Sequence, residues 1–127
     1  MRIKDLKPRA AISVTSGETL RAAAKHLADD DIGALVVLGA VGAVGIFSER
    51  DLARSVADGA DLDDEPVDEY MTEAPVTVPY DSGLGDAIAK MNEYGVRHLV
   101  VVDGRDVIGM ISMRDLLALL GTAWPEL

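Results

Sequence analysis

The sequence predicts a layered α+β fold, composed of two β-α-β-β-α repeats related by a pseudo-two-fold axis. The first observation is a repeated motif. Residues 45–52 read Gly-Ile-Phe-Ser-Glu-Arg-Asp-Leu, and residues 109–116 read Gly-Met-Ile-Ser-Met-Arg-Asp-Leu, 64 positions later. The second observation is that the surrounding sequence aligns in the same register, since residues 35–37 and 99–101 both read Leu-Val-Val. Two such copies favour two similar units packed face to face, because a solenoid needs at least three repeats.

Each repeat is expected to open with a short helical turn, followed by a short strand and a helix. The turns fall at residues 3–6 and 67–71, and β-branched runs follow at residues 12–15 and 76–78. The helix of the first repeat is expected from Glu18 to Asp29. Its apolar residues recur at helical spacing, with the same offsets in both repeats: Leu20, Ala23, Ala24 and Leu27, then Leu84, Ala87, Ile88 and Met91.

A strand pair and a second helix complete each repeat. We expect residues 34–38 to pair with 43–47, and residues 98–102 to pair with 106–111. Asp103-Gly104 is a strong hairpin signal, and the segment from Gly39 to Gly42 serves the same end less sharply. The last helix of each repeat follows the Ser-x-x-Asp part of the motif. Because these strands are apolar on both faces, they should be buried on both faces.

The domain boundaries follow from the duplication and from charge. Residues 1–57 form the first repeat, residues 58–66 an acidic linker and residues 67–127 the second repeat, together one compact pair. Acidic residues dominate positions 58–73, and no basic residue lies among them. Because the stretch lacks the spacing of a calcium-binding loop, we interpret it as a solvated linker.

Composition excludes several classes of function. The chain has 127 residues and a formal net charge of −10, which opposes binding to nucleic acid. It contains no cysteine, which excludes disulfides, thiol catalysis and the common structural zinc sites. With two histidines, it is also a poor candidate for any metal site. No apolar run has the length of a signal peptide or a membrane span, so we expect a cytoplasmic, non-membrane protein.

We expect no enzymatic activity and therefore name no catalytic residue and no catalytic cofactor. The sequence has no histidine beside a nucleophilic serine, no Gly-x-Ser-x-Gly motif and no phosphate-binding Gly-x-x-x-x-Gly-Lys-Ser/Thr loop. His26 matches Lys90 of the second repeat, and we expect it on a solvated helix face.

The repeated motif has a structural and a functional interpretation. Ser48 and Ser112 can cap a helix, with Asp51 and Asp115 three residues later. A cap alone gives no reason for the preceding glycine and hydrophobic residues, or for the matching arginines, Arg50 and Arg114. A helix N-terminus is an anion site, and a carboxylate beside it suits a sugar diol, because it can accept from two adjacent hydroxyls. The arginines can serve a phosphate or a stabilising ion pair.

The repeated β-α-β-β-α unit, with Gly, two hydrophobic residues and Ser-x-x-Asp at its last strand–helix corner, resembles the CBS domain. The whole chain resembles a stand-alone tandem CBS pair, or Bateman module. This resemblance implies a regulatory module that binds adenosine-containing ligands in two clefts between the units. AMP, ADP or ATP are the first choices, before S-adenosylmethionine or NAD(H). It implies that Asp51 and Asp115 take the ribose hydroxyls, and that Ser48 and Ser112 lie against ribose or phosphate.

The resemblance also implies that the first short strand and the start of the second frame the adenine. By position these residues are Ser13, Ile32, Gly33 and Ala34 in the first repeat and Thr77, Val96, Arg97 and His98 in the second. Because Arg97-His98 replaces Gly33-Ala34, the two sites should differ, and the second should have more capacity for phosphate. If these two residues do not bind a ligand, we expect Arg97 to be a solvated surface charge and His98 to be a half-buried residue at the strand edge.

The resemblance further implies a homodimer and an effector protein that responds in trans, since no attached enzyme, channel or DNA-binding segment is recognised. The alternative is a ligand-free structural or dimerisation module, in which Ser-x-x-Asp is only a cap.

Overall fold

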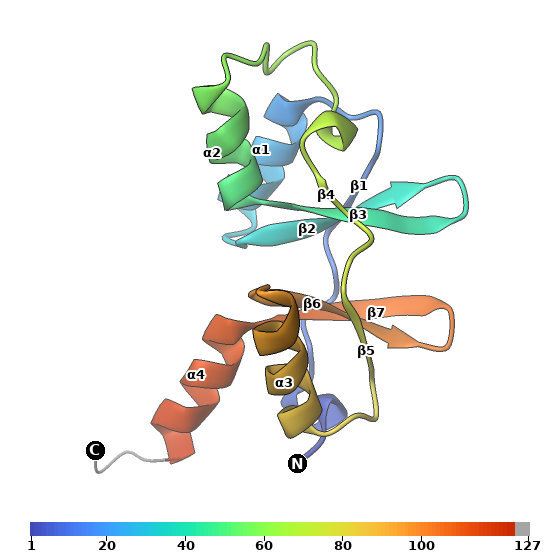
Figure 1. The fold of residues 1–127 in the computed structure, drawn as a ribbon, viewed down its shortest axis with the longest axis vertical. Helices are drawn as coiled ribbons and strands as arrows, with labels where there is room; N and C mark the ends of the chain where they lie inside the picture. The colour runs from blue at the N-terminus through green and yellow to red at the C-terminus, as the bar shows by residue number, and fades with distance from the viewer. Residues whose placement is uncertain (124–127) are drawn as a thin grey trace. The chain divides into compact units, whose positions relative to one another are not determined.

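The computed structural model describes residues 1–123 of the chain (Figure 1). These residues divide into two compact units. The central unit is Ile12–Pro75, and the terminal unit combines Met1–Ala11 with the chain from Val76 onward. Each unit has its own sheet, its own pair of α-helices and its own apolar core.

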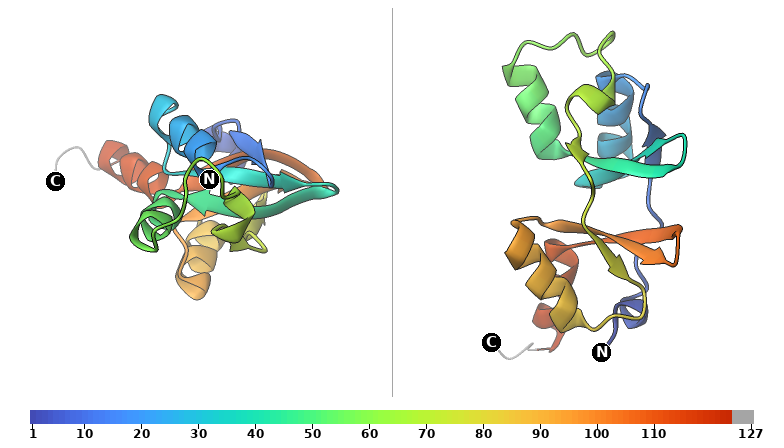
Figure 2. Two further views of the ribbon diagram at one scale, coloured as in Figure 1. Left: turned by 90° about the horizontal axis from the view of Figure 1, so that it is seen from above. Right: turned by 45° about the vertical axis from the view of Figure 1, so that its right-hand side comes forward.

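The central unit is built on a four-stranded sheet in the order β1-β2-β3-β4. Strand β1 is parallel to β2, and the other neighbouring strands are antiparallel. Figures 1 and 2 show both helices on the same face of this sheet. The elements are β1 (Ser13–Thr15), α1 (Leu20–Asp29), β2 (Ala34–Gly39), β3 (Gly42–Ser48), α2 (Glu49–Ala57), the 3₁₀ helix η2 (Val67–Glu69) and β4 (Thr72–Glu73).

The terminal unit repeats this arrangement with a three-stranded sheet in the order β5-β6-β7. Strand β5 is parallel to β6, and β6 is antiparallel to β7. Both of its helices again lie on one face of their sheet (Figures 1 and 2). The elements are the 3₁₀ helix η1 (Ile3–Leu6), β5 (Thr77–Pro79), α3 (Leu84–Tyr94), β6 (His98–Asp103), β7 (Asp106–Ser112) and α4 (Met113–Ala123).

The predicted fold class is confirmed, because both units have the order β-α-β-β-α and the fold is mixed α+β. Ala34–Val37 are all buried, so β2 is covered on both faces as the apolar run predicted. Both β-hairpins have a register irregularity at matching positions, between Val37 and Leu38 in the first and between Val101 and Val102 in the second. The turn of the second hairpin lies one residue later than expected, because Asp103 pairs with Asp106.

The opening turns of the two repeats are exchanged between the compact units. Ile3 is fully buried in the core of the terminal unit, and its N–H donates to the carbonyl oxygen of Ser82 at 2.9 Å. Val67 is fully buried in the core of the central unit, and its N–H donates to the carbonyl oxygen of Glu18 at 2.8 Å. Each compact unit therefore combines most of one sequence repeat with the opening segment of the other.

The acidic stretch after α2 is exposed at most of its charged residues, but it also hydrogen-bonds to the start of α1. The N–H groups of Leu20 and Arg21 donate to the carbonyl oxygens of Glu65 and Leu62, at 3.0 and 2.9 Å. The Arg21 guanidinium forms an ion pair with Asp63. These contacts satisfy backbone groups at the start of α1 and give the stretch a fixed path.

Within residues 1–123, no helix combines the length and the apolar character that crossing a bilayer requires.

Candidate functional site

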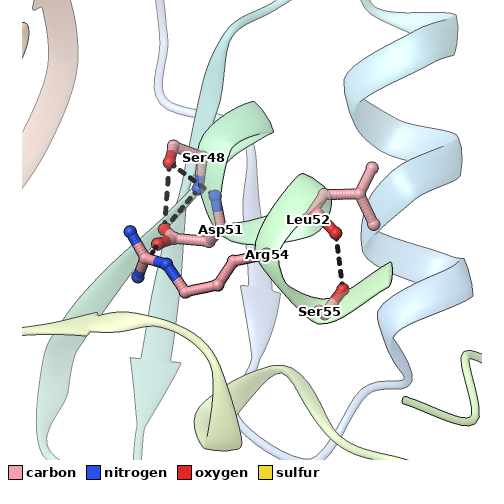
Figure 3. A network of polar contacts seen from close by, with 5 residues as sticks. All are labelled: Ser48, Asp51, Leu52, Arg54 and Ser55. Carbon is pink, nitrogen blue, oxygen red and sulfur yellow. Dashed lines mark hydrogen bonds and ion pairs between the residues drawn. The ribbon is translucent and has the colours of Figure 1, made fainter. Parts of the chain in front are cut away.

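The first copy of the motif forms the corner where β3 ends and α2 begins. Ser48 has an extended backbone, with φ −109° and ψ 168°, and it is the N-cap of α2. Its hydroxyl accepts a hydrogen bond from the N–H of Asp51 at 3.2 Å. In return, Asp51 Oδ2 accepts from the N–H of Ser48 at 2.9 Å and from its hydroxyl at 3.0 Å. This reciprocal capping box fixes both side chains (Figure 3).

A third residue completes the network at this corner. The Arg54 guanidinium lies beside the Asp51 carboxylate, with Nη1 3.5 Å from Oδ1 (Figure 3). The side chain of Asp51 is 3% exposed, whereas that of Arg54 is 58% exposed. A carboxylate this well covered keeps its charge at low cost only when it is paired and hydrogen-bonded, and here both oxygens have partners.

The second copy forms the same corner between β7 and α4, with a simpler network. Asp115 Oδ2 accepts from the N–H of Ser112 at 2.8 Å, and the Ser112 hydroxyl accepts from the N–H of Asp115 at 3.1 Å. The residue that corresponds to Arg54 is Ala118, and in the part of the chain that the structure describes no guanidinium pairs with this carboxylate. Asp115 is half-buried rather than buried.

In the central unit, the start of β2 is joined directly to the corner. Ala34 pairs with Ser48, and the first helical N–H, that of Glu49, donates to the carbonyl oxygen of Gly33 at 3.0 Å. Because β1 is parallel to β2, Ser13 lies at the same end of the sheet, in register with Val36. The strand order therefore brings the predicted residues of β1, β2 and the motif to one end of the sheet.

The terminal unit brings its predicted residues together in the same way. His98 pairs with Ser112, and the N–H of Met113 donates to the carbonyl oxygen of Arg97 at 2.8 Å. Thr77 pairs with Val100, and its carbonyl oxygen accepts from Lys90 Nζ at 2.6 Å.

The residues just before β2 and β6 are positioned by the way the preceding helices end. The N–H of Ile32 donates to the carbonyl oxygen of Leu27 at 3.2 Å, and that of Val96 donates to Met91 at 3.0 Å. The residue before each donor is left-handed, as a Schellman turn requires. Ile32 and Val96, expected to frame an adenine, are thus positioned by a backbone turn, and their side chains also pack against the cores of their units.

The predicted basic residues lie at the surface. Arg50, Arg97 and Arg114 are exposed, and none has an ion-pair partner among residues 1–123. His98 is half-buried. Arg97 also borders, with Val96 and Met113, an open hollow of about 580 Å³ in the terminal unit. At the matching first positions of β2 and β6, Ala34 is buried and His98 is half-buried.

Sequence reasoning missed Arg54 and gave no role to the motif glycines. A Cβ built on Gly45 would lie 2.7 Å from the carbonyl oxygen of Thr72, and one on Gly109 would lie 2.5 Å from that of Arg9. Both glycines therefore admit a crossing backbone segment. The pattern that indicates Arg54 is Asp-x-x-Arg, which places the two side chains one helical turn apart in the first repeat only.

Neither unit presents a group of three or more His, Cys, Asp or Glu side chains suited to a metal ion within residues 1–123. His26 is half-buried, and its Nδ1 lies 3.6 Å from Asp30 Oδ2 on the same helix.

Two segments of the chain, residues 3–58 and 67–122, match the family model of the CBS domain. The chain belongs to the CBS domain family. One matched segment lies on each sequence repeat, so the chain is a tandem CBS pair.

Solved CBS structures cover almost the whole chain. A CBS domain protein from Pyrobaculum aerophilum, solved in complex with AMP, is 32% identical and has a TM-score of 0.85. That match covers 97% of this chain and 98% of the other. Another CBS domain pair, solved with 5′-methylthioadenosine and S-adenosyl-L-methionine, is 26% identical with a TM-score of 0.87 and the same coverage.

Curated relatives extend beyond the region that this CBS pair matches. An uncharacterized protein of Acidianus ambivalens is 36% identical over 100 residues, which cover 77% of this chain and 60% of the relative. An uncharacterized protein of Methanocaldococcus jannaschii is 28% identical over 127 residues, which cover 99% of this chain and 42% of the relative. The chain thus spans 60% and 42% of the length of these two relatives.

Proposed function

We propose that this CBS pair is a regulatory module that binds an adenosine-containing ligand at its Ser-x-x-Asp corners. The observation that carries the proposal is the geometry of Asp115. One oxygen of its carboxylate holds the helix cap at 2.8 Å, while the half-buried side chain leaves the other oxygen to accept further hydrogen bonds. A hydrogen bond to a charged group contributes about 1.5–3 kcal/mol, and the cap holds this acceptor rigid beforehand.

The ligands of related CBS proteins support the same chemical class. AMP, 5′-methylthioadenosine and S-adenosyl-L-methionine share an adenosine and differ in what the 5′ carbon carries. The shared ribose diol suits the carboxylates of Asp51 and Asp115, with Ser48 and Ser112 against ribose or phosphate. Ser13 with residues 32–34, and Thr77 with residues 96–98, would frame the base.

The charges at the terminal corner favour a ligand that carries phosphate. In the terminal unit, exposed Arg97 lies beside the α4 N-terminus, and both favour an anion. Exposed Arg114 adds a third positive feature to this corner. AMP, ADP or ATP are therefore the first candidates, ahead of S-adenosylmethionine and NAD(H).

We further propose a regulatory role in the cytoplasm, in which occupancy changes the affinity of the module for an effector protein in trans. Such an effect is limited by how much better the ligand binds one conformation than another. No catalytic residue is proposed.

A ligand-free dimerisation module is the second candidate. The observation that favours it is a set of apolar side chains exposed on helices α2, α3 and α4, namely Val56 at 57%, Ile88 at 48% and Leu117 at 58%. A homodimer is also compatible with ligand binding, so the two candidate functions differ only in whether the module binds a ligand. Thermal denaturation with AMP, ADP, ATP, NADH and S-adenosylmethionine separates them, because a ligand that prefers the native state raises the midpoint.

Calorimetry with AMP tests the ribose assignment directly. Asp115→Asn removes the charge but keeps an oxygen that can accept from Ser112, so the cap persists. We expect this variant to bind AMP about tenfold more weakly or worse. Asp103→Asn, at the exposed end of β6, is the matched control and should bind as the wild type does. Unchanged affinity in both Asp51→Asn and Asp115→Asn would remove the ribose–carboxylate assignment.

A further inference from the structure

The two motif carboxylates differ in how many of their hydrogen-bonding positions are occupied. At Asp51, Oδ2 accepts two hydrogen bonds from Ser48, at 2.9 and 3.0 Å, and Oδ1 faces the Arg54 guanidinium at 3.5 Å (Figure 3). The side chain is 3% exposed. Oδ1 makes no hydrogen bond to the cap, and this oxygen is already paired with a cation.

The Asp115 corner lacks this pairing. Oδ2 accepts one hydrogen bond, from the Ser112 N–H at 2.8 Å, and within residues 1–123 no guanidinium pairs with Oδ1. The Ser112 hydroxyl accepts from the Asp115 N–H at 3.1 Å, but it does not donate to this carboxylate as Ser48 does to Asp51. Both the carboxylate edge and the hydroxyl hydrogen are thus available to a ligand.

We infer that Arg54 is an affinity-determining residue that competes with ligands for the Asp51 carboxylate, so that the Asp115 corner is occupied first. The inference rests on the proposed function, because it ranks the two corners for the same ligand class. A ribose hydroxyl must replace or share the Arg54 contact at Asp51. At the Asp115 corner, the corresponding residue, Ala118, has no side chain that can compete.

The magnitude follows from the exposure of Arg54. Its side chain is 58% exposed, so the ion pair is screened by water and resembles a surface pair. Pairs of this kind stabilise by amounts equivalent to a factor of about two to five in an equilibrium constant. Arg54 therefore weakens binding at its corner by about that factor rather than abolishing it.

A neutral probe is needed, because a phosphate would itself attract Arg54. Adenosine carries the ribose diol without a phosphate, so its affinity reports the competition alone. Calorimetric titrations with adenosine, and in parallel with AMP, are made on the wild type and on four variants, Arg54→Gln, Ala118→Arg, Asp51→Asn and Asp115→Asn. Lys25→Gln is the matched control. It also removes an exposed positive charge from the central unit, but Lys25 is in helix α1 and is remote in sequence from Asp51.

The expected result has three parts. Asp115→Asn removes the tighter binding event and Asp51→Asn the weaker one. Arg54→Gln strengthens the weaker event about two- to fivefold, and Ala118→Arg weakens the tighter event by a similar factor. Lys25→Gln changes neither.

Several outcomes overturn the inference while leaving the proposed function intact. These are a tighter event that Asp51→Asn removes, and adenosine affinities that Arg54→Gln leaves unchanged or weakens. If only AMP binds measurably, the same order of events is read from AMP. If neither probe binds to the wild type, the proposed function fails, and the inference fails with it.

Discussion

Gly109 lies directly against the backbone of Arg9. The N–H of Met110 donates to the Arg9 carbonyl oxygen at 3.1 Å, and a Cβ built on Gly109 would lie only 2.5 Å from that oxygen. Gly45 has the same relationship with Thr72, whose carbonyl oxygen would lie 2.7 Å from an added Cβ. The first residue of the CBS motif is therefore a glycine because another segment of its own unit crosses the strand there.

Alanine at Gly109 or at Gly45 should destabilise the fold. Contacts under 3 Å to a backbone oxygen cannot relax by rotating a side chain, so the crossing segment must move. We expect a loss of about 1–3 kcal/mol in the free energy of unfolding for each variant, measured by urea denaturation.

Gly85→Ala is the matched control for these two variants. Gly85 is in helix α3, and an added Cβ would have no atom within 4 Å. Alanine there should stabilise the protein by about 0.4–1 kcal/mol, because it favours the helix and restricts the unfolded chain. Equal effects at Gly85 and Gly109 would show that crowding is not the cause.

A second pair of positions tests the turns that end α1 and α3. Asp31 has φ 52° and Gly95 has φ 64°, so both residues are left-handed. Gly95→Ala meets no neighbouring atom, and its cost of about 1 kcal/mol should come from the backbone alone. Asp31→Gly should have the opposite sign and raise the thermal midpoint. A fall in the midpoint of Asp31→Gly would assign a stabilising role to the aspartate side chain.

Much of the site was predictable because it depends on local backbone patterns that occur twice. The Ser-x-x-Asp spacing predicts a capping box, and both corners contain one. The parallel first strand and the hairpin then bring residues 13 and 33 to the corner of residue 48, as the order β-α-β-β-α requires.

Other features depend on contacts that periodicity does not encode. Ile3 and Val67 occupy matching positions in the two repeats, and both are apolar. The alignment of the repeats therefore does not reveal that Ile3 packs in the core formed mostly by the second repeat, and Val67 in the core formed mostly by the first. The pairing of Arg54 with Asp51 likewise depends on a side-chain rotamer. A sequence comparison places Arg54 opposite Ala118 without showing which carboxylate the arginine contacts.

The ion pair between Arg21 and Asp63 predicts a pH dependence of stability. The hydrogen bond from the Arg21 guanidinium holds the pKa of the Asp63 carboxyl below its ordinary value. A carboxyl with a lowered pKa in the fold stabilises the protein above its unfolded pKa of about 3.9, and this stabilisation is lost as the pH falls through the folded value. Asp63→Asn should therefore lower the thermal midpoint at pH 7, and its difference from the wild type should shrink below about pH 4. A difference that is independent of pH would exclude the ion pair as its source.

The two serine caps should contribute unequally to stability. Removal of an N-cap hydroxyl costs about 0.5–2 kcal/mol, and both Ser48→Ala and Ser112→Ala should show this loss in urea denaturation. Ser48 also donates its hydroxyl hydrogen to the buried Asp51 carboxylate at 3.0 Å, whereas Ser112 makes no such contact with half-buried Asp115. Because a buried charge that loses a hydrogen bond is costly, Ser48→Ala should be the more destabilising variant by about 1 kcal/mol. Ser48→Thr and Ser112→Thr keep the hydroxyl and should recover most of each loss. Equal losses in the two alanine variants would show that the Ser48–Asp51 hydroxyl bond contributes nothing beyond the cap.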